Sequence, residues 1–177
     1  MNADVSARLA WPSDARAIAQ VQIAAWREDY AGLLPDDVLL DLKAEPFADS
    51  WEASLTTPKD ARVRVLVALE RATVRGFALV HPSQDPDADP IVDCEVAEFI
   101  VDPLHRRAGH GSRLLQACVD TLVADKFTRG LWWVGASNDV LRGFVTGTGW
   151  EADGAHRELA TEAGATLKQI RLHTQLA

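Results

Sequence analysis

The feature that most constrains the fold is a change of hydrophobic period along the chain. Apolar residues recur at helical spacing between residues 15 and 30, whereas residues 62–70 and 73–82 form strand-like apolar runs joined by a short link. Such a link predicts a β-hairpin. A third strand pattern covers residues 91–101 and leads directly into a glycine-rich bend. Helical and strand patterns mixed in this way indicate an α/β fold.

The rest of the pattern completes the order of elements. Alternation over residues 5–11 predicts a first strand, and the acidic, proline-rich residues 83–90 predict a solvated loop. The coarse prediction is one strand, two helices, three strands, a helix, a strand, a helix and two strands. The other predicted ranges are short helices at 36–42 and 45–55, a helix from the bend to about Lys126, a strand at 130–136, a short helix within 137–150 and a last strand at 166–176.

Size and composition are those of an ordinary globular protein. Of 177 residues, 47% are hydrophobic and 25% charged, so we expect residues 1–177 to form a single domain. The net charge of −8 argues against binding to nucleic acid or to an anionic membrane. No apolar run is long enough to cross a membrane and the first residues lack a signal-peptide pattern, so we expect a cytoplasmic location. Cys94 and Cys118 lack metal-ligand spacing, so we expect buried thiols and no metal.

Positive charge gathers at the bend although the chain as a whole is acidic. The sequence VDPLHRRAGHGSRLL, residues 101–115, places Arg106, Arg107, Gly109 and Gly111 at the start of the following helix. A helix start leaves backbone N–H groups unpaired, glycines let a phosphate approach the backbone, and arginines add charge-assisted hydrogen bonds. The bend therefore predicts a site for a phosphate-bearing ligand. The alternative is a glycine-containing turn with solvated arginines.

Several segments resemble one known family, the GNAT (Gcn5-related) N-acetyltransferases. Arg106-x-x-Gly109-x-Gly111, directly after a strand ending in FIVDP, is similar to the family's pyrophosphate-binding signature [RQ]-x-x-G-x-[GA]. CEVAEFIVDP resembles the family's fourth strand, and SNDVLRGFVTGTGWEADG resembles its later N-x-x-A-x-x-[FL]-Y-x-x-x-G-F segment. The first part of the chain, from ARLAWP to PDDVL, resembles the first strand and paired helices of many bacterial members. The resemblance implies the GNAT fold, which is a mixed, mostly antiparallel twisted sheet of six to seven strands flanked by about four helices.

The resemblance also implies acetyl-CoA as co-substrate. Backbone groups of residues 99–101 would pair with the pantetheine arm where two strands splay apart, and the amides of residues 107–112 would hold the pyrophosphate. Asn138 matches a cofactor-contacting asparagine, with a helix N-cap as the alternative, and Phe144 matches an aromatic near the thiol end, with a core aromatic as the alternative. The implied cofactor set is Phe99, Ile100, Val101, Arg106, Arg107, Ala108, Gly109, His110, Gly111, Ser112, Asn138 and Phe144.

The reaction implied by the family is attack of a neutral amine on a thioester, which needs a base and an oxyanion donor. Glu95 matches the family glutamate that often acts as base, and its alternative role is that of a surface carboxylate. Strand alternation places Glu98 on the opposite face of that strand. The backbone N–H of Val101 is the expected oxyanion donor.

The chain departs from the family pattern at two acid/base positions. The family tyrosine that often protonates the leaving thiolate falls at Val145, and a second glutamate found in some members falls at Trp133. A thiolate is a tolerable leaving group without an acid. The alternative is a substitute acid, for which the candidates are Tyr30, Ser137 and His110.

The helices near the N-terminus wall the acceptor site in this family. Trp26 and Tyr30 are therefore candidate acceptor-site residues, with core packing as the alternative for Trp26. The resemblance implies transfer of an acetyl group to a primary amine of a small molecule by direct attack in a ternary complex. The alternatives are a non-catalytic acyl-CoA-binding or regulatory module, which the absent tyrosine favours, and an enzyme acting on protein N-termini. A homodimer is also compatible with the family.

Overall fold

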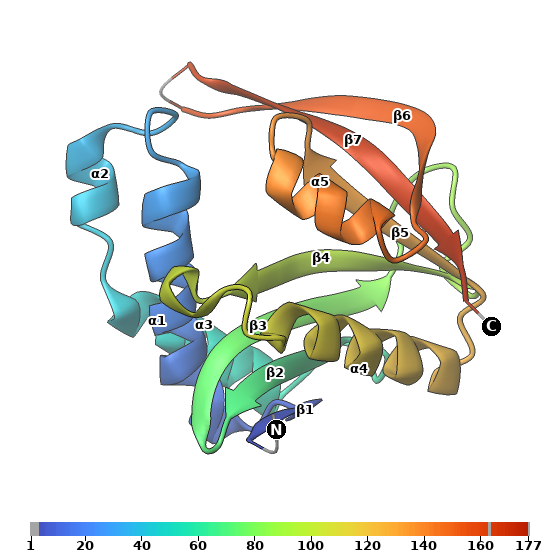
Figure 1. Ribbon diagram of the computed structural model, residues 1–177, viewed down its shortest axis with the longest axis horizontal. Coiled ribbons are helices and arrows are strands. Elements are labelled where there is room, and N and C mark those ends of the chain that lie inside the picture. Colours follow the sequence, from blue (N-terminus) through green and yellow to red (C-terminus); the bar gives the residue numbers. More distant parts are fainter. Residues whose placement is uncertain (1–3, 163, 177) are drawn as a thin grey trace.

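In the part of the chain that the structure describes, seven strands form one sheet in the order β1-β2-β3-β4-β5-β7-β6 (Figure 1). This computed structural model describes residues 4–162 and 164–176. Neighbouring strands are antiparallel except β4 and β5, which are parallel, so the predicted mixed, mostly antiparallel sheet is confirmed. The strands are β1 (Val5–Leu9), β2 (Arg64–Glu70), β3 (Thr73–Pro82), β4 (Asp93–Val101), β5 (Arg129–Gly135), β6 (Glu151–Ala160) and β7 (Thr166–Gln175).

Helices cover both faces of the sheet (Figure 1). Helix α4 packs on one face over the larger core cluster, which includes Leu66, Val96 and Leu114. Helices α1 and α3 cover the other face, over a smaller cluster that includes Ile18, Phe77 and Ile100. The α-helices are α1 (Ala15–Asp29), α2 (Asp36–Leu40), α3 (Ala44–Thr56), α4 (His110–Ala124) and α5 (Asp139–Thr146), and short 3-10 turns cover Pro12–Asp14 and Pro103–His105.

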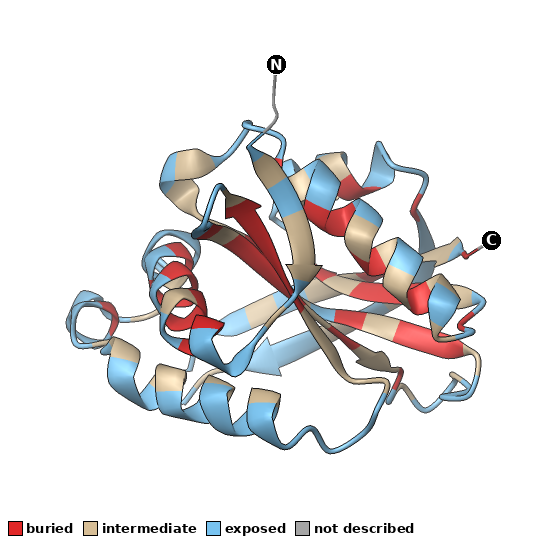
Figure 2. Cartoon of the chain, turned by 90° about the horizontal axis from the view of Figure 1, so that it is seen from below, coloured by how far each residue is buried: buried red, intermediate tan, exposed pale blue. Residues whose placement is uncertain are grey.

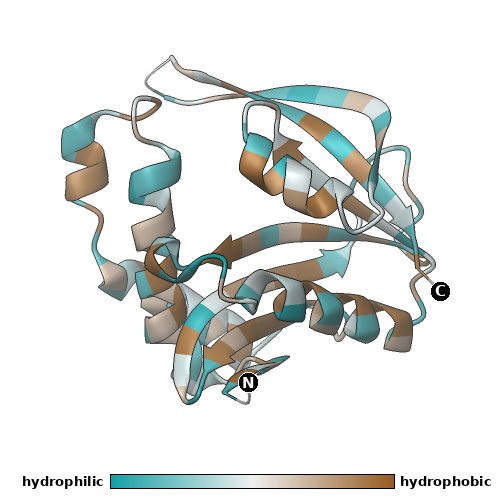
Figure 3. Ribbon diagram, viewed as in Figure 1, coloured by the Kyte–Doolittle hydropathy of each residue, from teal (hydrophilic) through white to brown (hydrophobic). Residues whose placement is uncertain are grey.

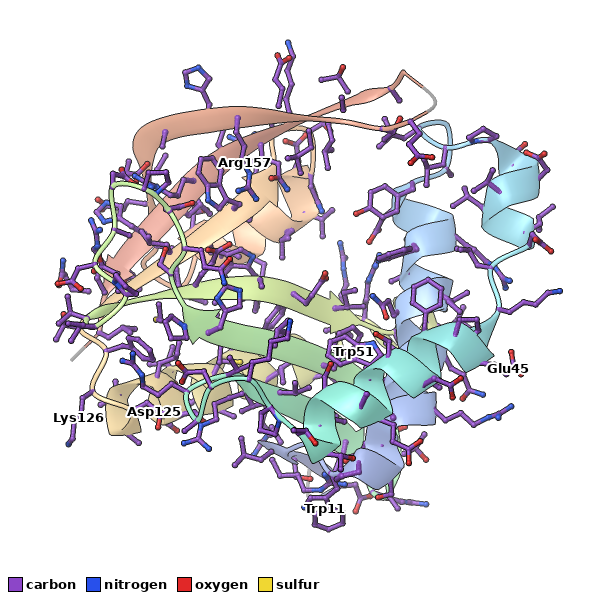
Figure 4. The ribbon with its side chains drawn as sticks, turned by 180° about the vertical axis from the view of Figure 1, so that it is seen from behind. Trp11, Glu45, Trp51, Asp125, Lys126 and Arg157 are labelled. Atoms are coloured by element: carbon purple, nitrogen blue, oxygen red, sulfur yellow. The ribbon has the colours of Figure 1, made fainter. Side chains whose placement is uncertain are left out.

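Apolar spacing explains how each helix docks. In α4 the buried residues include Leu114, Cys118 and Leu122, which are four apart and so share one face. Figure 2 shows that buried residues lie on the sheet side of α1 and α4, whereas α3 is largely exposed. Trp51, labelled in Figure 4, nevertheless anchors α3, because its ring lies 5.3 Å from that of Phe77 on the sheet. None of the helices in the described ranges is long and apolar enough to cross a membrane.

The β6–β7 hairpin is the part of the sheet that the sequence pattern located least well. Most of β6 is exposed on both faces, so it lacks the alternation that reveals a half-buried strand. Figure 3 shows hydrophilic residues along much of β6, whereas β2, β3 and β4 carry apolar stretches. The predicted hairpin between β2 and β3, the loop over residues 83–90 and the helix at 45–55 are all present.

Candidate active site

The bend opens directly into α4 and has the geometry of an anion site. Gly109, the N-cap of α4, has φ +89°, and Arg107 has φ +60°, so two residues of the bend are left-handed. Residues other than glycine rarely adopt this backbone conformation. Left-handed residues of this kind turn successive N–H groups toward a common point, and the start of a helix adds partial positive charge. This geometry is compatible with a phosphate site at the bend, and binding of a phosphate by the backbone of residues 107–112 stays a prediction.

Strand β4 leaves β5 just before this bend. The two strands pair only from Asp93 opposite Arg129 to Val96 opposite Trp132. Beyond that point residues 98–101 pair with β3 on one side, and residues 97–101 pair with no residue of β5 on the other. The sequence-based expectation of two splayed strands is met, and the slot between them is lined by the backbone of Phe99, Ile100 and Val101.

Aromatic side chains pack beside the splayed part of β4, on the α4 side of the sheet. Phe144 of α5 stacks on Phe99 with ring centroids 6.0 Å apart, and a Cβ added to Gly111 would lie 3.5 Å from Phe144 Cζ. Gly111 therefore lets the α4 start approach the aromatic ring closely. Asn138 accepts a hydrogen bond from the Leu141 N–H at 3.1 Å, which shows that it caps α5. Its contact with a cofactor stays a prediction.

A β-bulge in β4 corrects the expected position of Glu98. Val80 pairs with Val96 but Leu79 pairs with Glu98, so Ala97 is an extra residue. The bulge reverses the alternation. Phe99 packs with the α4-side core, as Val96 does, and Ile100 packs with the α1-side core. Glu95 and Glu98 therefore lie on the same face, toward α1 and α3, and not on opposite faces as strand alternation had indicated.

Of the two glutamates, Glu98 is the one whose burial is not offset by a nearby charge or hydrogen bond. Burial alone raises its pKa to about 7, without an offsetting charge or hydrogen bond. Tyr30, at the end of α1, is near enough that Glu98 raises the pKa of its phenol, after the larger effect of burial. Trp26 packs edge-on against Tyr30 with ring centroids 5.7 Å apart. The structure thus brings the two predicted acceptor-site residues together with Glu98.

Glu95 lies in a more polar environment at the other end of the bulge. It pairs across the strands with His81. Its pKa is raised, because burial and the charge of Asp85 outweigh the lowering effects of His81 and Arg157. Arg157 on β6, labelled in Figure 4, stacks on the ring of Trp133 at 4.3 Å. A buried cation that sequence reasoning missed, Arg171, fixes the loop over residues 83–90 through ion pairs with Asp85 at 3.1 Å and Asp87 at 2.6 Å.

Trp133 and Val145, which stand at the family's acid/base positions, and His110, a candidate acid, have structural roles in the fold. Trp133 donates its indole N–H to Asp85 at 2.9 Å, so the residue at the second family-glutamate position holds the 83–90 loop. Val145 is completely buried in the larger core. The ring of His110 is 1% exposed, and neither of its nitrogens has a partner among the described residues. That ring is therefore sealed from the slot, and only the backbone N–H of His110 is available to a phosphate.

Comparisons with known proteins agree with this architecture. A model of the acetyltransferase (GNAT) family matches residues 22–150. The mycothiol acetyltransferase of Kineococcus radiotolerans is 34% identical over 101 residues, which make up 57% of this chain but 27% of that protein. This chain therefore matches only about a quarter of the length of that relative.

Two solved structures share the whole fold. The yncA protein of Salmonella typhimurium, solved with its cofactor acetyl-CoA, has a TM-score of 0.73 at 19% identity over 98% of this chain and 95% of that one. The PaiA N-acetyltransferase of Thermoplasma acidophilum, in complex with coenzyme A, has a TM-score of 0.69 at 15% identity over 97% and 98% of the two chains. Identities this low establish the fold alone. Since the family model covers most of the chain, the protein belongs to the GNAT family of acetyltransferases, as its motifs predicted.

Proposed function

We propose that this protein transfers an acetyl group from acetyl-CoA to a primary amine of a small molecule by direct attack in a ternary complex. The observation that carries this proposal is the placement of three features along β4. The strand is splayed from β5 over residues 97–101, and it ends at the bend that opens α4. It also carries the half-buried Glu98 on the face toward α1, where Glu98 is near enough to raise the pKa of Tyr30.

The residues present fit acetyl-CoA. The backbone of Phe99, Ile100 and Val101 offers an unpaired edge to the pantetheine amides, and the amides of residues 107–112 offer donors to the pyrophosphate. Phe144 covers the slot beside Gly111. When bound, acetyl-CoA supplies an activated thioester. The Val101 N–H is the proposed donor to the oxygen that becomes negative during attack.

Glu98 is the proposed proton acceptor. An alkylamine is protonated at neutral pH and must lose a proton before it attacks, and a carboxylate with a pKa of about 7 is suited to that task. Glu95, whose pKa burial also raises, stays a second candidate, but the charges of His81 and Arg157 offset part of that rise, whereas no charge offsets it at Glu98. Tyr30 is the proposed proton donor to the leaving thiolate, because it shares the face of Glu98 and the family tyrosine position is the buried Val145.

The acceptor class is supported by charge and by one relative. Glu98 and Tyr30 lie beside the acidic end of α1, where Asp29 also raises the pKa of Tyr30, so this side of the slot favours a cationic amine over an anionic acceptor. The relative named mycothiol acetyltransferase supports an acceptor of small size.

A non-catalytic acyl-CoA-binding module is the second candidate function. The specific observation that favours it is Val145, which removes the family's acid and is fully buried in the core. The two proposals agree on cofactor binding and differ in turnover.

The deciding experiment incubates the purified protein with acetyl-CoA and a panel of primary amines, with release of free thiol as the readout, beside a calorimetric titration with CoA. We expect CoA binding and amine-dependent thiol release. CoA binding without turnover on any amine would favour the non-catalytic module. Absence of CoA binding would refute both proposals.

A further inference from the structure

The side chain of Arg106 connects the bend to the end of α1. Its Nη1 atom lies 2.8 Å from Glu28 Oε1, and its Nη2 atom lies 3.6 Å from Asp29 Oδ1. We call these three residues the Arg106 cluster. Arg106, the first residue of the pyrophosphate signature, is therefore already paired with two carboxylates of α1.

The two carboxylates lie where a helix disfavours them. Glu28 and Asp29 occupy the last turn of α1, at the negative end of the helix dipole. Arg27, the basic residue of the same turn, does not neutralise them, because its guanidinium donates to the backbone oxygens of Leu39 at 3.1 Å and Leu42 at 3.0 Å. Arg106 therefore supplies the counter-charge that α1 itself lacks.

The cluster lies between the two halves of the proposed site. On one side Arg106 directly precedes the left-handed Arg107 and the α4 start. On the other side Asp29 directly precedes Tyr30, whose phenol is near enough to Glu98 for that carboxylate to raise its pKa. Glu28 and Asp29 are 57% and 42% exposed, so both carboxylates can exchange partners with solvent or with a ligand.

We propose that the Arg106 cluster exchanges counter-ions on cofactor binding: the pyrophosphate takes over Arg106, and the released Glu28 and Asp29 then attract the ammonium form of the acceptor. The inference rests on the proposed function. Binding linkage is reciprocal, so the cluster makes each substrate strengthen the binding of the other.

Charge-neutral variants test the exchange by binding alone. Glu28→Gln with Asp29→Asn leaves Arg106 unpaired, so the affinity for CoA measured by calorimetry should rise about three- to fivefold, the size expected for two weak exposed ion pairs. Arg106→Gln should weaken CoA binding. In the Arg106→Gln background the gain from the acidic-pair variant should shrink to less than about twofold. Glu45→Gln is the matched control, since Glu45 is an exposed residue of α3 (Figure 4) whose Oε1 atom lies 3.9 Å from Nη2 of Arg16.

The acceptor side has its own readout. With the acidic pair neutralised, the KM for the amine should rise by a larger factor than kcat falls, and Glu28→Gln alone should give an intermediate shift. If the acidic-pair variant gains the same CoA affinity with and without Arg106, the gain arises from long-range charge repulsion, and the exchange is refuted. Unchanged CoA affinity in the acidic-pair variant would also refute it. Failure of the unmodified protein to bind CoA would instead refute the proposed function.

Discussion

Glu98→Gln is the substitution that most directly tests the proposed chemistry. The amide has nearly the shape of the carboxyl group but cannot accept the amine's proton. Glu98 is held on the α1 face by the bulge at Ala97, and burial is the cause of its raised pKa. Because a base acts in the transition state, we expect a loss of turnover with little change in CoA affinity.

The pKa of Glu98 fixes how the loss should depend on pH. With a pKa of about 7, the carboxylate form is about a tenth of the protein at pH 6 and about nine tenths at pH 8. The turnover of the unmodified protein divided by that of Glu98→Gln should therefore grow by about tenfold between these values. At pH 8 the ratio itself should be about 10²–10⁴ if Glu98 is the main base. The acceptor's own ionisation is common to both proteins and cancels in the ratio.

The assay is thiol release at saturating acetyl-CoA and amine, measured at half-unit steps from pH 6 to pH 8.5. Glu95→Gln is the matched control, since it makes the same chemical change on the same face of the same strand. It should lose less activity than Glu98→Gln at every pH. Melting temperatures show whether each variant is folded. A Glu98→Gln ratio below about threefold at every pH, or a larger loss in Glu95→Gln, would overturn the assignment of the base.

Three further predictions concern the bend, the buried histidine and the valine. Gly109→Glu places a carboxylate at a left-handed position of the anion site, so CoA affinity measured by calorimetry should fall at least tenfold; unchanged affinity would exclude this bend as the pyrophosphate site. Burial lowers the pKa of His110, so the unfolded state takes up a proton that the folded state refuses, and stability should be complete above about pH 6.5 and decline as pH falls below it. Chemical denaturation between pH 4.5 and 7 should show that the free energy of unfolding declines less steeply in His110→Leu. For one proton the decline is at most about 1.4 kcal/mol per pH unit, and an identical decline in the variant would contradict the prediction. Val145→Tyr should destabilise the fold by about 1–3 kcal/mol without raising turnover, because Val145 is completely enclosed; a stable and faster variant would show that the ring reaches the slot.

Local patterns in the sequence were sufficient to predict most elements and to propose where the cofactor binds. Helical spacing located α1 and α4, and the run before the bend located β4, because periodicity depends only on which side of an element is buried. The glycines and arginines of the bend predicted an anion site from local sequence as well, since the conformation of a helix start is decided by adjacent residues. The signature of the family added the splay between β4 and β5.

The acceptor side needed the tertiary structure. The face on which Glu98 lies depends on the extra residue Ala97, and a bulge is set by the pairing of two strands rather than by the residues of one. Arg106 finds its partner Glu28 across 78 residues of chain, and no spacing rule connects positions so far apart. The sequence by itself determined most of the elements and the family, and it predicted the phosphate site at the bend, because these follow from short-range periodicity and turn chemistry. Only the packed structure decided which carboxylate faces Tyr30 and which charges neutralise one another, because strand register and burial arise from contacts between distant segments.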